Sequence, residues 1–233
     1  MKDVKVETFE IEVIGRIYTD FPSKFGIPRQ SGLVESLEGK IIFEPKFRSE
    51  AAVKGLENHS HLWLIWQFSE VADKGWSPTV RPPRLGGNTR VGVFASRSPF
   101  RPNHLGLSSV KLVKIEMDEN LGPILYVSGV DLMDNTPILD IKPYMPYADS
   151  HPEAYTGVFE HVEKKKLKVY IPQELLDKVP SNKREVMKEV LAEDPRPSYQ
   201  HDAQRIYGLS FARLNVRFRV DGDKLTVLEV EDL

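Results

Sequence analysis

The sequence predicts a mainly β protein with a small α+β region at its C-terminal end. In residues 1–160, short runs of β-branched and aromatic residues alternate with glycine and proline turn signals. Helical periodicity is nearly absent there, so successive strands are not separated by long crossover helices. An antiparallel barrel or sandwich is therefore expected for residues 1–160, with a second, smaller domain over residues 161–233.

The first domain is expected to contain short strands and a single helix. Phe9, Ile11 and Val13 alternate with glutamates, which is typical of a strand with one buried face. A helix is predicted over residues 49–56, with Ser49 as its N-cap. Five further runs have the composition of strands: 41–43, 61–68, 91–94, 110–115 and 124–127.

The second domain is expected to combine a strand, a helical stretch and a hairpin. Residues 167–171 have strand composition, and Pro172 then opens a helical pattern that ends at a pair of prolines after Asp194. Residues 214–220 and 225–230 alternate in hydrophobicity on either side of Asp221-Gly222. That arrangement predicts a hairpin with its turn at the glycine.

Composition limits the class of protein and its location. The chain has 233 residues, a net charge of −2 and no cysteine, so disulfides and thiolate metal sites are excluded. The first residues lack the apolar core of a secretory signal, and no apolar run approaches the roughly 18 residues of a membrane span. A cytoplasmic protein is expected.

The common cofactor and nucleophile motifs are missing from the sequence. It contains no GxGxxG after a strand, no GxxxxGK[ST] and no GxSxG. His59 and His61 lie two residues apart, which would place both on one face of a strand. Because no carboxylate stands at ligand spacing, a packed or hydrogen-bonded pair is favoured over a metal site, and no metal is predicted.

An acid-free zone stands out in this slightly acidic chain. Residues 74–114 contain eight Lys/Arg and no Asp/Glu, and they include the loop VGVFASRSPFRPNHLG. Such a zone predicts an electropositive face, and arginine forks suit phosphate. Nucleic acid is the natural large polyanion, with a small anion or a merely solvated loop as alternatives. The predicted RNA-contacting cations are Arg81, Arg84, Arg90 and Arg101.

Two other segments carry polar groups held by prolines. Pro28-Arg29-Gln30 offers a guanidinium and an amide on a restrained backbone, although an ordinary surface turn would read the same way. In the second segment, Asp131 or Asp134 can bind ribose hydroxyls, and Tyr144 or Tyr147 can stack on a base. An Asx turn with aromatic packing is the structural alternative.

These segments together resemble the TrmO family of S-adenosylmethionine-dependent tRNA methyltransferases, also described as YaeB or VirR-like. The matching stretches are PRQSGLVES, GLENHSHLWLIW, the whole of 75–110, VSGVDLMDNTPILDIKPYMPYADS, EDPRPSY and LNVRFRV. The resemblance implies a single β-barrel with a small C-terminal domain. It also implies a homodimer with its active site near the subunit interface, and methylation of N6 of threonylcarbamoyladenosine beside the tRNA anticodon.

The resemblance also implies roles for individual residues. The resemblance places the C-terminal DPRPSY motif near the active site, and its residues Asp194, Arg196 and Tyr199 are therefore expected to take part in catalysis. Ser69-Glu70 stand where relatives often have His-Gln or His-Glu, so a histidine side-chain contact would be lost at Ser69. The implied cofactor contacts are Pro28, Arg29, Gln30, Ser69, Glu70, Arg97, Leu107, Asp131, Leu132, Met133 and Asp134.

The proton acceptor for the reaction is not identified by the sequence. Asp194 and Tyr199 are candidates by motif position, and Arg196 or Arg97 can hold the threonyl carboxylate through a guanidinium fork. Two other functions remain open: a non-catalytic RNA- or nucleotide-binding barrel, which the change at Ser69 favours, and a methyltransferase acting on another substrate. The intact PRQ, DLMD and DPRPSY segments favour catalysis.

Overall fold

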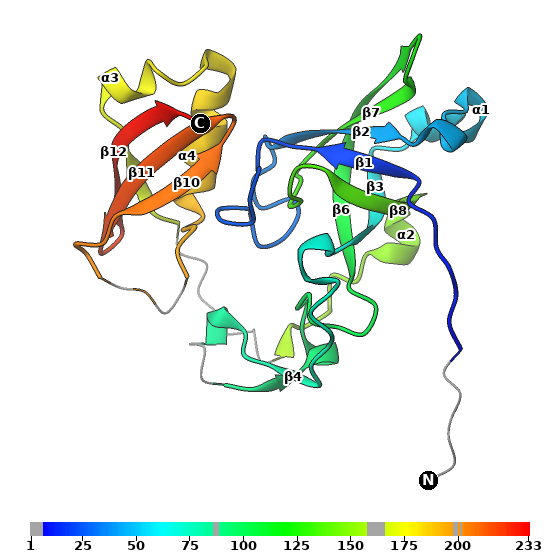
Figure 1. Ribbon diagram of the computed structural model, residues 1–233, viewed down its shortest axis with the longest axis horizontal. Helices are drawn as coiled ribbons and strands as arrows, with labels where there is room; N and C mark the ends of the chain where they lie inside the picture. Colours follow the sequence, from blue (N-terminus) through cyan, green and yellow to red (C-terminus); the bar gives the residue numbers. More distant parts are fainter. Residues whose placement is uncertain (1–6, 86–88, 158–165, 198–199, 201) are drawn as a thin grey trace.

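The computed structural model describes residues 7–85, 89–157, 166–197, 200 and 202–233. Six strands form a closed antiparallel barrel in the order β1-β2-β7-β6-β3-β8 (Figure 1). Their bounds are β1 Gly15–Tyr18, β2 Glu38–Phe43, β3 His61–Gln67, β6 Leu105–Asp118, β7 Gly122–Ser128 and β8 Thr136–Pro143. Side chains fill the interior of this barrel, so it is a packed scaffold.

Strand β3 illustrates how the barrel separates its two faces. Leu62, Leu64 and Trp66 are buried in the core, whereas Trp63 and Ile65 between them are only partly covered. Because successive side chains of a strand point to opposite faces, the second set lies on the outside of the barrel. This outer face becomes important below, because it forms a wall of the main cavity.

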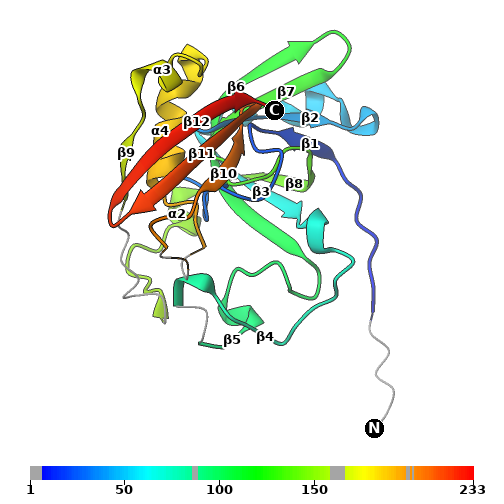
Figure 2. The same cartoon turned by 60° about the vertical axis from the view of Figure 1, so that its left-hand side comes forward.

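A second sheet makes up the C-terminal domain. Its strand order is β10-β11-β12-β9, with bounds β9 Lys168–Tyr170, β10 Tyr207–Phe211, β11 Leu214–Asp221 and β12 Lys224–Asp232. Helices α3 (Gln173–Leu176) and α4 (Arg184–Ala192) pack on one face of this sheet (Figure 2). The buried side of α4 is formed by Met187, Val190 and Leu191.

Short elements complete the fold. Strands β4 (Thr79–Val80) and β5 (Val91–Gly92) form a two-stranded ribbon outside the barrel. The remaining helices are α1 Glu50–Val53 and α2 Pro146–Asp149, and the 3-10 turns are η1 Pro45–Phe47, η2 Leu56–Asn58, η3 Ser69–Val71, η4 Pro83–Leu85, η5 Val93–Ala95 and η7 Ser181–Lys183. Within the described residues, no helix is both long enough and apolar enough to cross a membrane.

The loop between β1 and β2, residues 19–37, joins the two domains, and we call it the bridging loop (Figure 1). Phe21 packs against Phe211 of β10 with ring centroids 5.3 Å apart. Asp20 accepts a 2.6 Å hydrogen bond from Lys183 Nζ, and its carbonyl accepts one from the Ala212 amide. The two domains consequently share one continuous hydrophobic core.

Most of the predicted architecture is confirmed, including the mainly β barrel and the smaller α+β domain with its terminal hairpin. The strand expected at Phe9, Ile11 and Val13 is wrong: residues 7–14 form no strand, and Phe9 is 78% exposed. Pairing begins only at Ile14, whose amide donates to the Ile138 carbonyl, so the preceding residues have no neighbouring strand to cover them.

Other boundaries also differ from the expectation. The helix predicted over 49–56 is regular only at Glu50–Val53, and Ser49 makes no side-chain cap bond. The run 91–94 pairs only at Val91–Gly92 before it turns into η5. Strands β1, β4, β8 and β10 were not predicted.

Candidate functional site

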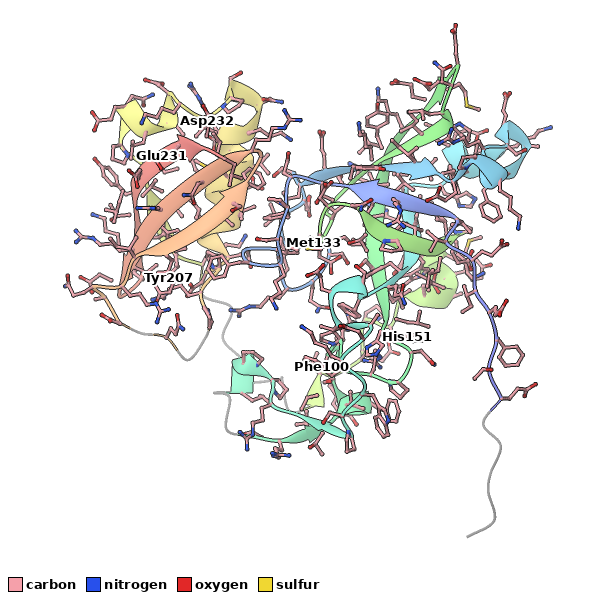
Figure 3. All side chains as sticks on the ribbon, viewed as in Figure 1. Phe100, Met133, His151, Tyr207, Glu231 and Asp232 are labelled. Atoms are coloured by element: carbon pink, nitrogen blue, oxygen red, sulfur yellow. The ribbon has the colours of Figure 1, made fainter. Side chains whose placement is uncertain are left out.

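A cavity of about 870 Å³ lies where the outer face of the barrel meets the loops around it. Trp63 and Ile65 of β3, together with Leu107 of β6, give it an apolar wall. Loops contribute the polar groups, from residues 28–31, 69–70, 96–101 and 131–133. Two of the lining residues, Met133 and Phe100, are labelled in Figure 3. An apolar wall with a few convergent polar groups is typical of a small-molecule site.

The bridging loop brings Pro28, Arg29 and Gln30 to the cavity. Two contacts fix this end of the loop on the barrel: the Ser109 amide donates to Ser31 Oγ at 3.2 Å, and the Gly32 amide donates to the Gly129 carbonyl. The PRQ segment therefore has a defined position on β6.

Arg97 and Asp131 provide opposite charges in the same cavity. Arg97 Nη1 donates to Gln30 Oε1, which ties the 96–101 loop to the bridging loop. Asp131 Oδ1 accepts a 2.6 Å hydrogen bond from Ser108 Oγ, and that hydroxyl in turn accepts one from Trp66 Nε1 at 3.0 Å. The buried Trp66–Ser108 pair thus fixes the orientation of the Asp131 carboxylate.

Burial raises the pKa of Asp131 above its ordinary value. Hydrogen bonds from Ser108 and from backbone amides, and the positive charge of Arg97, lower the pKa and oppose that effect. A partly desolvated carboxylate of this kind favours a cationic ligand group, because binding would restore the compensating charge.

The cavity unites most of the predicted cofactor residues. Leu132 and Asp134 do not line it: Leu132 is buried in the core, and Asp134 Oδ1 accepts from the Thr19 amide at 2.9 Å. The predicted residues that do line it are Pro28, Arg29, Gln30, Ser69, Glu70, Arg97, Leu107, Asp131 and Met133.

The residues predicted as catalytic lie beside the cavity, on the other side of the bridging loop. Asp194 and Arg196 bind each other: Nε donates to Oδ1 at 2.8 Å and Nη2 donates to Oδ2 at 2.9 Å. Arg196 is 8% exposed, and neither residue lines the main cavity. Tyr199 lies outside the described residues.

The predicted RNA-contacting residues are spread more widely. Arg101 lines the cavity, but its guanidinium also donates to the Ser96 carbonyl at 3.1 Å and so holds its own loop. Arg81 and Arg90 are exposed near the β4–β5 ribbon, whereas the side chain of Arg84 lies outside the described part of the structure. Tyr144 packs on Trp63, and Tyr147 is exposed on α2.

Three exposed aromatic residues near the cavity were not predicted. Trp76, Phe94 and Phe100 are 55%, 75% and 38% exposed. They lie on neighbouring segments, since the Ser77 amide donates to the Phe100 carbonyl and the Val93 amide to that of Pro78. All three belong to the acid-free zone, so interleaved aromatic and basic residues within 74–101 were the available sequence signal.

Fold and site define a class: two-domain β-barrel proteins whose cavity combines the outer barrel wall with the loops around it. The chain matches the model of the tRNA-methyltransferase O N-terminal domain over residues 16–150 and that of the TrmO C-terminal domain over residues 164–233. The chain therefore belongs to the TrmO family.

Two individual relatives and one solved structure show this similarity. The chain is 39% identical over 234 residues to the Escherichia coli (strain K12) tRNA (adenine(37)-N6)-methyltransferase, covering 97% of this chain and 99% of that protein. It is 46% identical over 163 residues to the enzyme of the same name from Eikenella corrodens, covering 70% and 91%. A crystal structure of TrmO from Pseudomonas aeruginosa aligns with a TM-score of 0.77 and 32% identity, covering 97% of this chain and 100% of that one.

Proposed function

We propose that this protein transfers the methyl group of S-adenosylmethionine to N6 of adenosine 37 of tRNA, and that the accepted form is threonylcarbamoyladenosine. The observation that carries the proposal is the cavity itself. It joins the PRQ segment, Arg97 and Asp131 against an apolar wall, in a chain of the TrmO family. The full-length likeness to a tRNA (adenine(37)-N6)-methyltransferase supports the reaction and its position on the tRNA.

The cavity residues fit S-adenosylmethionine. Trp63, Ile65 and Leu107 offer apolar surface for a purine, and Asp131 offers a carboxylate for the positively charged end of the molecule. Arg97 offers a guanidinium fork for a carboxylate. When bound, S-adenosylmethionine supplies an electrophilic methyl group on a sulfonium centre.

This chain contributes position and charge to the reaction. N6 of the modified adenosine is a weak nucleophile, so alignment with the methyl–sulfur bond is the main requirement, and orientation of this kind supplies roughly 7–11 kcal/mol in well-aligned systems. The apolar wall excludes water, while the Trp66–Ser108–Asp131 hydrogen bonds keep the carboxylate in place.

The acid-free zone is the proposed tRNA contact. Single-stranded anticodon-loop bases can be splayed out and stacked on aromatic side chains. Trp76, Phe94 and Phe100 offer such surfaces, and Arg81 and Arg90 offer charge for phosphates. Because Phe100 also lines the cavity, an adenosine bound against these aromatic residues would be close to the methyl donor.

We also propose that the protein is a cytoplasmic homodimer. Support for the dimer comes from the resemblance to the family and from exposed apolar side chains along β6, namely Leu107, Val113 and Met117. Sedimentation of the purified protein, with and without a charge placed at Val113, tests the dimer.

The decisive experiment is methyl transfer from radiolabelled S-adenosylmethionine to two tRNA preparations, one carrying the threonylcarbamoyl group and one lacking it. Incorporation into the modified tRNA alone is expected. Incorporation into the unmodified tRNA as well would refute the proposed substrate form. Cofactor binding without transfer to either tRNA would favour a binding protein or a methyltransferase acting on another acceptor, the two alternatives to the proposal.

A further inference from the structure

The bridging loop lies between two cavities of the protein. One side of Pro28 and Arg29 lines the main cavity, and the other lines a small cavity of about 30 Å³ shared with Asp194 and Pro195. Arg29 Nη2 donates to the carbonyl of Arg196 at 3.1 Å and to that of Asp194 at 3.5 Å. A side chain of the proposed cofactor loop therefore reaches the backbone of the C-terminal domain.

The turn at residues 194–197, whose carbonyls Arg29 binds, is stabilised by its own hydrogen bonds. Asp194 has a φ of +52°, a left-handed conformation that aspartate tolerates because its short side chain bonds locally. Its carboxylate takes both guanidinium bonds of Arg196 and also accepts from the Arg196 amide at 3.3 Å. The pairing raises the pKa of Arg196 above its ordinary value, and prolines 195 and 197 restrain the backbone on either side.

These contacts form one continuous path. The Asp194–Arg196 pair fixes two carbonyls, Arg29 binds those carbonyls, and the next residue, Gln30, accepts from Arg97 in the cavity. The Asp194 carboxylate and the Arg196 guanidinium are paired with each other, and neither side chain lines the main cavity. They reach the cavity residues only through the two carbonyls that Arg29 binds.

We propose that Asp194 and Arg196 are positioning residues, which set the geometry of the S-adenosylmethionine loop through Arg29. The inference rests on the proposed function, because it takes residues 28–30 as part of the cofactor site. It assigns the DPRP turn to cofactor binding rather than to contact with the adenosine. The C-terminal domain thereby takes part in a site that it does not line.

A double-mutant cycle on cofactor affinity tests this assignment. Asp194→Asn keeps the size and the left-handed backbone but removes the charge. We expect S-adenosylmethionine binding, measured by calorimetry without tRNA, to weaken about tenfold, a factor that corresponds to about 1.4 kcal/mol. In an Arg29→Met background, where the path is already cut, Asp194→Asn should cause no further loss.

Lys183→Met is the matched control, because it removes the ion pair to Asp20, another contact between the domains that does not involve Arg29. It should lower the melting temperature and leave cofactor affinity unchanged. If Asp194→Asn does not fold, Arg196→Lys takes its place in the cycle, since lysine keeps the positive charge but not the fork.

Three results would overturn the inference: unchanged cofactor affinity in Asp194→Asn, an equal loss in both backgrounds, or an equal loss in Lys183→Met. If Asp194→Asn leaves cofactor affinity unchanged but raises the KM for tRNA, Asp194 contacts the tRNA substrate instead. The wild-type protein separates this test from the proposed function. If it binds no S-adenosylmethionine, the proposed function fails, whereas normal wild-type binding leaves only the positioning role at issue.

Discussion

At Gly26 the bridging loop lies directly against Leu209 of the C-terminal sheet, and Gly26→Ala should destabilise this contact. The residue has a φ of +88°, a region that costs a residue with a Cβ about 1–2 kcal/mol. An added Cβ would lie 3.4 Å from Leu209 Cγ and well inside contact distance of Leu209 Cδ1. Leu209 is fully buried, so relief of that overlap requires repacking that costs about 1–3 kcal/mol.

The two costs together give a loss of roughly 2–5 kcal/mol in the free energy of unfolding. Each kcal/mol lowers Tm by about 2–4 °C in a chain of this size, so a decrease of about 4–20 °C is expected in a thermal melt followed by circular dichroism. Gly32→Ala is the control. Its φ of +77° carries the same backbone cost, but no atom lies within 4 Å of the added Cβ.

The overlap can be tested separately from the backbone cost. In a Leu209→Ala background the atoms that collide with the new methyl group are gone, so Gly26→Ala should cost no more there than Gly32→Ala costs in the wild type. Equal melting temperatures for Gly26→Ala and Gly32→Ala in the wild-type background would refute the contact between Gly26 and Leu209.

Three further perturbations follow from the site and the barrel. Asp131→Asn should weaken S-adenosylmethionine binding about tenfold, or about 1.4 kcal/mol, without lowering Tm, because burial disfavours the ionised carboxylate in the folded protein. Because the pKa of Asp131 is raised in the folded protein, this group stabilises the fold at low pH, and that contribution is lost as the pH rises through the folded-state pKa. The Asp131→Asn variant should therefore lack this part of the pH dependence of Tm. A decrease in Tm at neutral pH would contradict this reasoning. Trp76→Ala should weaken tRNA binding roughly 5–150-fold, the range that corresponds to one lost base stack, and leave cofactor affinity unchanged in fluorescence and calorimetric titrations. Phe9→Ala, an exposed aromatic outside the acid-free zone, is its control, and equal effects of the two would exclude specific stacking. Gly106→Ala should destabilise the barrel by about 3 kcal/mol or more, because its Cβ would lie 2.6 Å from Trp66 Cδ2 and closer still to other ring atoms. Gly92→Ala, with no atom within 4 Å, should be nearly neutral in the same urea titration, and a similar midpoint for both variants would argue against the tight packing of Trp66.

Strands were predicted well where a strand-like composition coincides with a neighbouring strand to pair with. β3 and the terminal hairpin combine apolar alternation with clear turn signals, and both are present. β8 was missed because Pro137 and Pro143 mark its ends, and proline is depleted in strands. Alternation alone failed for residues 9–13, since a strand also needs a neighbour to pair with, and nothing local in the sequence reports that neighbour.

The site was only partly predictable for a related reason. Motifs indicated Pro28–Gln30, Arg97 and Asp131, and the fold brings these together in one cavity. The outward side chains of β3 could not be assigned to a site, because Trp63 and Ile65 look like ordinary core residues until the barrel fixes which face is inside. Likewise, only the folded turn reveals that Asp194 and Arg196 bind each other.

Because β3 packs the barrel core with one face and lines the cavity with the other, its pairing register affects activity as well as stability. Leu62 and Leu64 fill the barrel, while Trp63 and Ile65 face the cavity; the buried Trp66 at the end of the strand also borders the cavity. A slip of one residue against β6 would exchange these roles, burying the cavity wall and exposing the packed leucines. The pairing of β3 with β8 shifts register between Ile65 and Trp66, close to the end of β3. Trp66 is nevertheless buried. In this protein, the correct pairing offset of one strand is itself a requirement for having a binding site.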